Sequence, residues 1–301
     1  MSDKNNHIVL SNCNLCNNNK FEKIADKLRE SDKYKVYKCA LCGHVQLLPH
    51  PDAEIEKQFY DEDRQERSIR PDVNLNNLRI NFRSDMLRRA EFISNNFSND
   101  KKIVDIGCGY GFFLEEMIKR GYKINGIEVS KIRRELAKTF VSAPILDINL
   151  TESYEREERY DIVTLFHVLE HLIDPARFCI NISQLLAKNG CFIVEVPNVD
   201  ELLLKTSPAY NEFYWTRAHL NYFSKKTLEM VLKKAGFKKI KIMYVQRYGI
   251  DNLFNWLIIG NPQIEKPVFE TYNSYKWLEK CYRDRLEKIG KSDTVFAVVY
   301  K

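Results

Sequence analysis

Short runs with the composition of strands alternate along the chain with segments that have the spacing of helices. Each run is five to nine residues long, as buried strands of a parallel sheet are. The runs in the middle of the chain predict five strands, at residues 102–106, 122–129, 143–150, 160–166 and 191–197. Two runs near the end predict two more, at residues 238–245 and 293–301.

The segments between these runs have the end signals of helices. A helix is predicted after residue 111, with an apolar stripe and Gly121 at its end, and another over residues 130–140. Asp174 is a predicted N-cap before a helix that ends at Gly190, and Ser224 caps a further helix. Strands and helices that alternate in this way predict a mostly parallel sheet with helices packed on it.

The bulk composition bounds the class of protein. The 301-residue chain is 44% hydrophobic and 29% charged, which is typical of a globular chain with one large domain and a small one. It has no apolar run of about 18 residues, so we expect no membrane span. The first ten residues lack the charged-then-apolar layout of a signal peptide, so we expect a cytoplasmic protein.

Two cysteine pairs of equal spacing lie near the start of the chain. Cys13 and Cys16 flank two residues, Cys39 and Cys42 do the same, and 22 residues separate the pairs. In a reducing compartment, paired cysteines bind metal more often than they form disulfides. Two such turns place four thiolates around one ion, which suits zinc and leaves no open position for chemistry. We predict a structural zinc site that helps to fold a small N-terminal ribbon.

The first strand of the middle region runs into a glycine-rich turn, D-x-G-C-G-x-G. Gly107, Gly109 and Gly111 allow a tight turn before the next helix, and Glu128 lies near the end of the second strand, 17 residues later. An acid there suits the paired hydroxyls of a ribose. A dinucleotide-binding loop would have glycine where this chain has Phe112, and the lysine of a phosphate-binding loop is absent.

This turn resembles motif I of the class I S-adenosylmethionine-dependent methyltransferases. The blocks FHVLEHLIDP and FIVEVPN strengthen the resemblance, which covers about residues 75–245 and the last strand. It implies a Rossmann-like, doubly wound, mostly parallel seven-stranded sheet and S-adenosyl-L-methionine as cofactor, bound outside the carboxyl ends of the strands. The cofactor-binding residues that it implies are Asp105, Gly107, Cys108, Gly109, Gly111, Phe112, Glu128, Val129, Asp147, Ile148, Phe166 and His167.

The order of a four-cysteine module, a methyltransferase core and the stretch HLNYFS is similar to the sugar methyltransferases of deoxysugar and surface-glycan pathways. In their C-methyltransferases a histidine of the matching stretch is the base, and one after the fourth strand lines the site. The resemblance therefore implies His219 and His171 as catalytic residues. Glu170 is a further candidate, because an acceptor must lose a proton. Residues 216–218 and the short C-terminal region depart from the C-methyltransferase pattern, which favours O-methylation of a sugar hydroxyl.

We predict a domain boundary near residue 70. Residues 1–70 would form the zinc ribbon and a linker, and residues 71–301 the methyltransferase domain. Residues 246–293, between the last two strands, have helical spacing and are rich in Trp and Tyr. They predict a helical insertion, which is a packed appendage, a lid over the substrate or a homodimer face.

Two classes of methyl acceptor, a small molecule and RNA, are compatible with a methyltransferase that has a zinc ribbon. Base-amino methyltransferases commonly have an N/D-P-P-Y/F block after the fourth strand, where this chain has FHVLEH. Residues 1–50 contain eight Lys and Arg against five Asp and Glu, a weak excess for a module that reads phosphates. We therefore expect a sugar or nucleotide-sugar acceptor and no nucleic acid. The complete glycine turn argues against a catalytically inactive scaffold.

Overall fold

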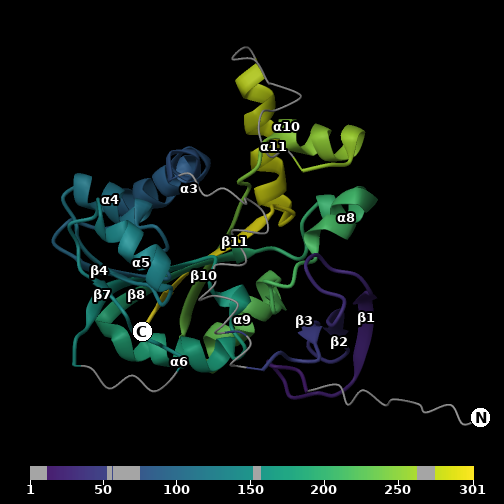
Figure 1. Cartoon of the computed structure of the whole chain (residues 1–301), viewed down its shortest axis with the longest axis horizontal. Helices are drawn as coiled ribbons and strands as arrows, with labels where there is room; N and C mark the ends of the chain where they lie inside the picture. Colours follow the sequence, from purple (N-terminus) through teal and green to yellow (C-terminus); the bar gives the residue numbers. More distant parts are fainter. Residues whose placement is uncertain (1–11, 53–55, 57–74, 152–156, 263–274) are drawn as a thin grey trace, which may run out of the picture.

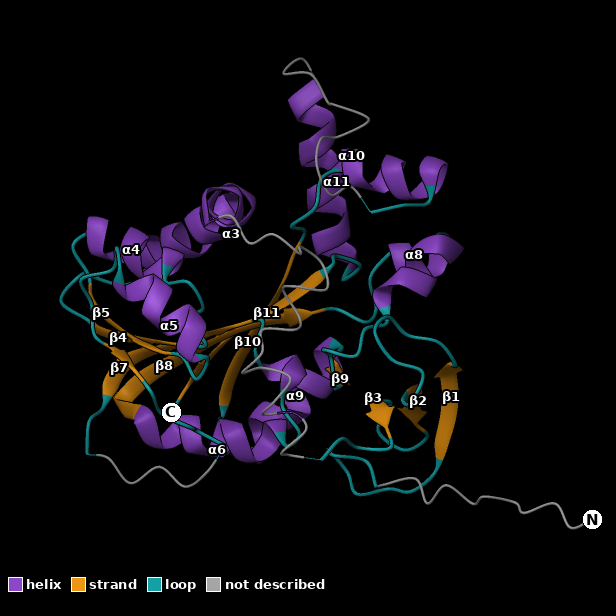
Figure 2. Cartoon of the chain, viewed as in Figure 1, coloured by secondary structure: helices purple, strands orange, loops and turns teal. Residues whose placement is uncertain are grey.

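The computed structural model describes residues 12–52, 56, 75–151, 157–262 and 275–301. A large seven-stranded sheet has helices on both faces, and a small four-stranded sheet lies beside it (Figure 1). Two helices from the segment before the last strand, α10 (Ile250–Phe254) and α11 (Lys276–Ile289), project beyond the edge of the large sheet (Figure 2).

The large sheet has the strand order β10-β11-β8-β7-β4-β5-β6. Its strands are β4 (Lys102–Ile106), β5 (Lys123–Ile127), β6 (Ile145–Leu146), β7 (Tyr160–Phe166), β8 (Leu186–Pro197), β10 (Lys239–Val245) and β11 (Thr294–Tyr300). The strands from β6 to β8 are parallel, and β11 runs antiparallel to both of its neighbours. The predicted seven-stranded, mostly parallel sheet is confirmed, and the carboxyl ends of its parallel strands meet at one edge.

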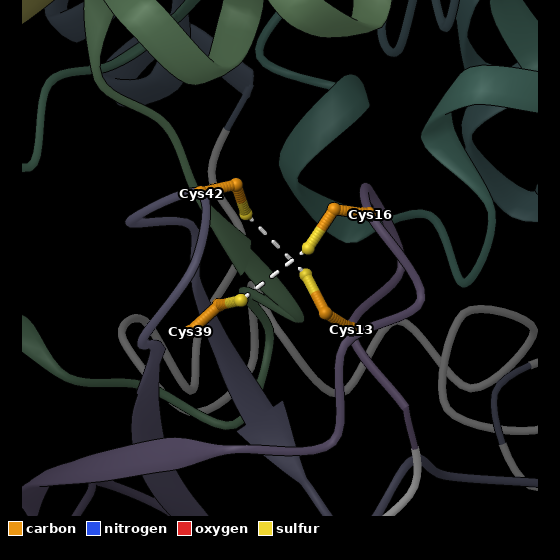
Figure 3. A group of neighbouring side chains, drawn as sticks. All are labelled: Cys13, Cys16, Cys39 and Cys42. Atoms are coloured by element: carbon orange, nitrogen blue, oxygen red, sulfur yellow. Dashed lines mark hydrogen bonds between the residues drawn. The ribbon is translucent and has the colours of Figure 1, made fainter.

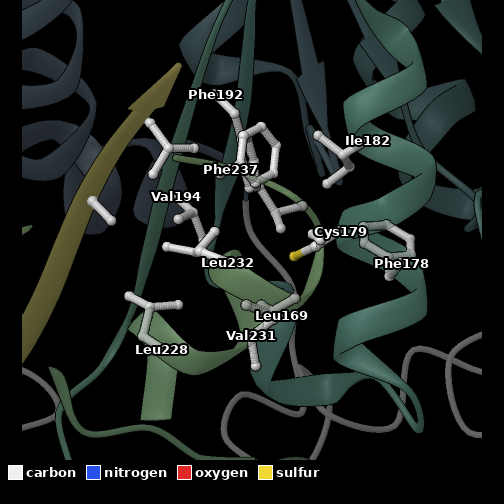
Figure 4. Packing of buried hydrophobic residues seen from close by; sticks show 14 of the residues in the cluster. Leu169, Phe178, Cys179, Ile182, Phe192, Val194, Leu228, Val231, Leu232 and Phe237 are labelled. Atoms are coloured by element: carbon white, nitrogen blue, oxygen red, sulfur yellow. The ribbon is translucent and has the colours of Figure 1, made fainter. Parts of the chain in front are cut away.

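Helices cover both faces because the central strands are apolar on both sides. One face carries α3 (Leu75–Asn96), α4 (Phe112–Lys119) and α5 (Lys131–Lys138); the other carries α6 (Pro175–Leu185) and α9 (Lys225–Lys234). Adjacent residues of β4 belong to different hydrophobic cores. Ile103 packs in the core with α3 and α4, and Val104 packs in the core with α6 and α9. In the second core, Phe192 of β8 lies near Ile182 of α6 and Leu232 of α9 (Figure 4).

Two features of this sheet region differ from the sequence prediction. The helix predicted to end at Gly190 ends at Leu185, and the strand predicted to begin at residue 191 begins at Leu186. Leu186 pairs with Tyr160 of β7, so strand pairing overrides the helical spacing of this segment. α3 has no counterpart in the prediction, because it is polar on most of its surface.

The small sheet combines two distant parts of the chain. It is antiparallel and consists of β1 (Phe21–Ala25), β2 (Lys35–Cys39), β3 (Val45–Leu48) and β9 (Asn221–Tyr222). β9 belongs to the stretch HLNYFS, and Val45 pairs with Tyr222. The cysteine turns share one buried cluster with Phe223 and Leu228, so the N-terminal segment packs directly on the larger domain. The boundary near residue 70 stays a prediction, since residues 57–74 lie outside the described ones.

The segment between β10 and β11 contains helices, as predicted. It contains α10, the π-helix η2 (Asn255–Ile259) and α11. Its Trp256 packs against Phe213 of α8 (Pro208–Tyr214), which follows the short helix α7 (Leu203–Thr206). Whether it is a lid or a dimer face stays a prediction, and residues 263–274 lie outside the described part. In the described ranges, no helix has both the length and the apolar character to cross a membrane.

Candidate active site

The glycine turn after β4 is fixed against the end of β5 by backbone hydrogen bonds. The N–H groups of Gly107 and Cys108 donate to the carbonyl of Ile127 at 2.7 and 3.1 Å. The N–H of Gly111 donates to the carbonyl of Cys108 at 2.9 Å, directly before α4. The ends of β4 and β5, two of the strands that carry predicted cofactor residues, are therefore held side by side.

The three glycines of this turn serve different purposes. All have positive φ angles, between 55° and 76°, which favour glycine. A Cβ at Gly107 would lie 2.4 Å from Val168, and one at Gly111 would lie 2.8 Å from Val141, so packing excludes a side chain at both. A Cβ at Gly109 would meet no heavy atom of the described residues within 4 Å. The backbone of Gly109 is therefore open to the approach of a ligand.

Glu128 lies against this open part of the turn. Its buried carboxylate accepts hydrogen bonds from the N–H groups of Gly109 and Ser130, each at 2.8 Å. The guanidinium of Arg134 donates to the Glu128 carbonyl at 2.7 Å and to the carboxylate of Asp147 at 2.8 Å. The structure thus brings Gly109, Glu128 and Asp147 together. Sequence reasoning missed Arg134, because its burial and its two partners are visible only in the structure.

Asp105, near the end of β4 and just before the glycines, fixes the strand end from the protein interior. It is buried and accepts a hydrogen bond from the Thr164 hydroxyl of β7 at 2.6 Å. Burial raises the pKa of Asp105 to about 7, although the bond from Thr164 acts to lower it. The side chain of Cys108 is also buried, and burial raises the pKa of its thiol. These two candidates face the protein interior, where they fix the shape of the turn.

The remaining apolar candidates surround the strand ends. Phe112 stacks on Phe140, with ring centroids 5.7 Å apart. Val129 is 49% exposed after β5, and Ile148 after β6 packs partly against the core. Phe166 meets Phe113 edge to face at the end of β7. The predicted cofactor residues therefore lie at or after the carboxyl ends of four neighbouring strands, β7, β4, β5 and β6.

His167 lies between two carboxylates. Its Nδ1 is 3.1 Å from Glu170 and its Nε2 is 3.0 Å from Glu195 of β8. Its φ angle of 56° is unusual for a residue other than glycine, and such strain is often found at functional sites. Arg247 also approaches Nε2, at 2.9 Å. Protein groups therefore occupy both ring nitrogens of this predicted cofactor residue.

A buried charged network adjoins His167, and the sequence analysis missed it. Glu195 is completely buried and accepts hydrogen bonds from Arg88 at 2.9 Å and Arg89 at 2.7 Å, both from α3. Burial acts to raise the pKa of Glu195, but Arg89, His167 and Arg88 hold it well below its usual range. Arg247 in turn donates to Asp85 at 2.8 Å. The one signal in the sequence was the acid inside the apolar run FIVEVP.

The three predicted catalytic residues form one cluster next to this network. Ligand-type atoms of Glu170, His171 and His219 lie within 4.8 Å of one another. Nδ1 of His171 donates to the carbonyl of Ala218 at 2.7 Å, and the two imidazole rings are 5.0 Å apart at 68°. One oxygen of the buried Glu170 faces His167; the other has no hydrogen-bond partner among the described residues. The cluster also has the donor types of a metal site.

The environment of the cluster keeps its histidines neutral and its acid ionised. Burial lowers the pKa of His219 to about 3 and also lowers that of His171. Burial acts to raise the pKa of Glu170, but the hydrogen bond from His167 outweighs it, and the pKa falls to about 2. At neutral pH the cluster therefore has two imidazoles able to accept a proton beside a carboxylate able to stabilise it.

The four cysteines of the N-terminal turns point toward a common centre (Figure 3). Sγ of Cys13 lies 3.6 Å from that of Cys42, and Sγ of Cys16 lies 3.4 Å from that of Cys39. All four sulfurs lie within 4.8 Å of one another, and none forms a disulfide. A tetrahedral ion with bonds of about 2.3 Å needs sulfurs about 3.8 Å apart, so the four residues fit a zinc ion.

The acidities of these thiols show what a cation would contribute. Burial raises the pKa of Cys13 to about 11 and also raises that of Cys42. At Cys39 burial acts in the same direction, but the N–H groups of Cys42 and Leu41 outweigh it and lower the pKa to about 6. A bound divalent cation would stabilise the thiolate form of all four residues.

Comparison with known proteins assigns the fold to a family. A family model described as a methyltransferase domain matches residues 78–242, more than half of the chain. The chain belongs to this methyltransferase family. The matched range of the methyltransferase includes the glycine turn, Glu128, the Glu170–His171–His219 cluster and β9.

Relatives of the methyltransferase include O-methyltransferases. The ubiquinone biosynthesis O-methyltransferase of Schizosaccharomyces pombe, a mitochondrial protein, is 28% identical over 148 residues, covering 47% of this chain and 51% of that protein. The ubiquinone biosynthesis O-methyltransferase of Saccharophagus degradans is 30% identical over 131 residues, covering 42% and 52%. The methyltransferase thus spans about half the length of these relatives.

Solved structures share the fold of the methyltransferase. A SAM-dependent methyltransferase from Thermotoga maritima, described as a possible histamine N-methyltransferase, gives a TM-score of 0.50 at 18% identity, covering 82% of this chain and 99% of that chain. The plantazolicin methyltransferase BpumL in complex with SAH gives 0.52 at 14% identity, covering 82% and 95%.

Proposed function

We propose that this methyltransferase transfers the methyl group of S-adenosylmethionine to a hydroxyl of a small molecule, a sugar or nucleotide-linked sugar. The observation that carries the proposal is that Glu170 and His171, shortly after β7, meet His219 of the loop before β9, and that β7 lies beside β4, which the open glycine turn follows. The O-methyltransferase relatives support an oxygen acceptor. The cysteine module and the stretch HLNYFS support a sugar.

The proposed cofactor site lies at the carboxyl ends of β4, β5, β6 and β7. S-adenosylmethionine, when bound, supplies a methyl group activated by a sulfonium. Glu128 would accept hydrogen bonds from the ribose hydroxyls, Asp147 would accept one from the adenine amino group, and the open backbone at Gly109 would allow close approach. Asp105, Cys108 and Phe112 would hold the shape of the turn, and Val129, Ile148, Phe166 and His167 would complete the walls.

His219 is the proposed general base. An imidazole with a pKa of about 3 is unprotonated at neutral pH but holds a proton weakly. The carboxylate of Glu170 compensates, because a buried carboxylate within 4.8 Å of the ring nitrogen stabilises the imidazolium that forms when a hydroxyl loses its proton. His171, whose Nδ1–H is engaged by the Ala218 carbonyl, would orient the acceptor or serve as the alternate base.

The second part of the proposal is that Cys13, Cys16, Cys39 and Cys42 bind one structural zinc ion. The sulfur separations and the low pKa of the Cys39 thiol support it. A closed set of four thiolates leaves no position for a substrate, so the ion would stabilise the small sheet and take no part in methyl transfer.

The test is methyl transfer from isotopically labelled S-adenosylmethionine to three acceptor classes: nucleotide sugars, catechol-type phenols and short RNAs. We expect labelled nucleotide sugars, with NMR placing the methyl carbon on oxygen. A methyl group on a ring carbon would contradict O-methylation, and transfer to RNA or phenols alone would contradict the sugar. A protein that binds no S-adenosylmethionine in calorimetry would contradict the whole assignment.

A further inference from the structure

The side chain of Asn221 lies between the cysteine turns and the histidine pair. Asn221 opens β9 and is completely buried. Its Oδ1 accepts hydrogen bonds from Nε2–H of His44 at 3.0 Å and from the Asn14 amide at 3.3 Å. Its Nδ2 donates to the carbonyl of Leu172 at 2.6 Å. Partners on both sides therefore fix the orientation of the amide.

On one side, the partners of Asn221 belong to the two cysteine turns. Asn14 lies between the first pair of cysteines, and its N–H donates to Gln46 of β3 at 3.1 Å. His44 follows the second pair, and its N–H donates to Sγ of Cys42 at 3.4 Å. The ring of His44 is completely buried, so a change in this turn is transmitted directly to the Asn221 amide.

On the other side, Asn221 joins the two loops that carry the histidines. Leu172, which accepts its hydrogen bond, directly follows His171, and His219 precedes Asn221 by two residues. A second bond, from Nδ1 of His171 to the Ala218 carbonyl, connects the same loops. Two side-chain-to-carbonyl hydrogen bonds, one from Asn221 and one from His171 itself, therefore connect the loops that carry the histidine pair.

From these contacts we propose that Asn221 is a positioning residue that couples the cysteine turns to the spacing of His171 and His219. The proposal rests on the proposed function of these histidines. Without the Asn221 amide, the Leu172 carbonyl and the His44 N–H lose a partner in the protein interior. The two loops then relax relative to each other, and a shift of about 1 Å in a catalytic group can lower a rate about 100-fold.

The experiment compares Asn221→Ala with Asn181→Ala, a matched control. Asn181 of α6 is also buried, and it donates at 2.8 Å to the carbonyl of Leu150, which lies in the loop after β6 and not in either histidine loop. In Asn221→Ala we expect kcat to fall about 10- to 100-fold, with KM for S-adenosylmethionine and bound metal unchanged. In Asn181→Ala we expect kcat to stay within about twofold, because its loss leaves the histidine loops joined.

The second readout needs no acceptor. The chain has six histidines, so a ¹H–¹³C spectrum of their ring protons is simple, and His171→Ala and His219→Ala assign two of the signals. Asn221→Ala and His44→Ala should shift both signals, and Asn181→Ala should shift neither. Asn221→Asp, which keeps the acceptor oxygen but loses the donor to Leu172, should give intermediate shifts and an intermediate kcat.

Unchanged kcat and ring signals in Asn221→Ala would overturn the positioning role, as would a loss confined to cofactor or metal binding. If Asn221→Ala does not fold, Asn221→Asp and His44→Ala are judged by the same criteria. Failure of the proposed function gives a different result. In that case His171→Ala and His219→Ala would keep full turnover, while the Asn221 variants would still shift the ring signals.

Discussion

The imidazole of His171 packs edge to face on that of His219, with ring centroids 5.0 Å apart. The two residues come from different loops, one after β7 and one just before β9. Burial lowers the pKa of both, so the pair is neutral when a substrate hydroxyl needs a base. Because a carboxylate oxygen of Glu170 lies within 4.8 Å of a ring nitrogen of each histidine, a proton taken up by either ring is stabilised.

His219→Ala should lower kcat by about 100- to 10,000-fold, the usual contribution of a positioned base. Affinity for S-adenosylmethionine should stay nearly unchanged, because the cofactor residues follow other strands. Steady-state kinetics and calorimetry measure the two effects. His171→Ala is the matched comparison. A His219→Ala enzyme with full turnover beside an inactive His171→Ala enzyme would show that the base is on the other loop.

Glu128→Ala should weaken cofactor binding by about 1–3 kcal/mol, because the ribose hydroxyls would lose their hydrogen-bond acceptor. Calorimetric titration with S-adenosylmethionine measures the change. NAD serves as the control ligand. Tighter binding of NAD than of S-adenosylmethionine, or unchanged affinity in the variant, would rule out the assignment.

Two variants of the same turn should distinguish its two roles: Gly109→Ala tests the space left for a ligand, and Gly107→Ala tests the tight packing against Val168. Both need a left-handed backbone, which costs about 1–2 kcal/mol with a side chain. At Gly107 the added methyl group also collides with Val168, so Gly107→Ala should be less stable than Gly109→Ala by about 1–3 kcal/mol. Gly109→Ala should fold but lose cofactor affinity. Equal melting temperatures, or unimpaired binding in Gly109→Ala, would contradict this division.

The purified protein should contain about one zinc ion per chain, and Cys39→Ser should lose it together with thermal stability. Elemental analysis and thermal unfolding give these two values. A second equivalent of metal that His219→Ala removes would identify the Glu170–His171–His219 cluster as a metal site, against the proposed base. A metal-free wild-type protein that is folded and fully active would exclude the structural role.

The ionisations of His219 and Asp105 should change the free energy of unfolding with pH in opposite directions. The pKa of His219 falls from 6.5 in the unfolded chain to about 3, so the unfolded state binds the extra proton and stability is lost as pH drops below about 6.5. The pKa of Asp105 rises from 3.8 to about 7, so its contribution is lost as pH rises from about 4 to 7. Urea unfolding across this range gives the free energy of unfolding as a function of pH. Its slope against pH should be lower than that of the wild type in His219→Gln and higher in Asp105→Asn.

The prediction from sequence was strongest where local signals repeat. The glycine turn, the helix that Ser224 caps and the alternation of strands and helices along the chain depend on residues close together in the sequence, and the structure confirms them. The two cysteine pairs were recognisable because each turn is a local unit of equal spacing. Their approach to one centre depends on the pairing of β1, which follows the first turn, with β2, which ends at Cys39.

The elements that the sequence analysis missed depend on long-range pairing. α3 has too few apolar positions to be recognised, yet it places Arg88 and Arg89 on Glu195, more than 100 residues away. The early start of β8 likewise depends on its pairing with β7. Neither feature has a periodic signal within its own segment.

The sequence by itself determined the sheet, the position of the glycine turn and the candidate chemistry of the cysteines and histidines, because apolar periodicity and motif spacing act over a few residues. Only the tertiary structure decided that β9 completes the small sheet and that Asn221 lies between the cysteine turns and the histidine pair. The physical reason is that a buried amide takes its partners from whatever backbone the fold brings near it, and no local pattern encodes that proximity.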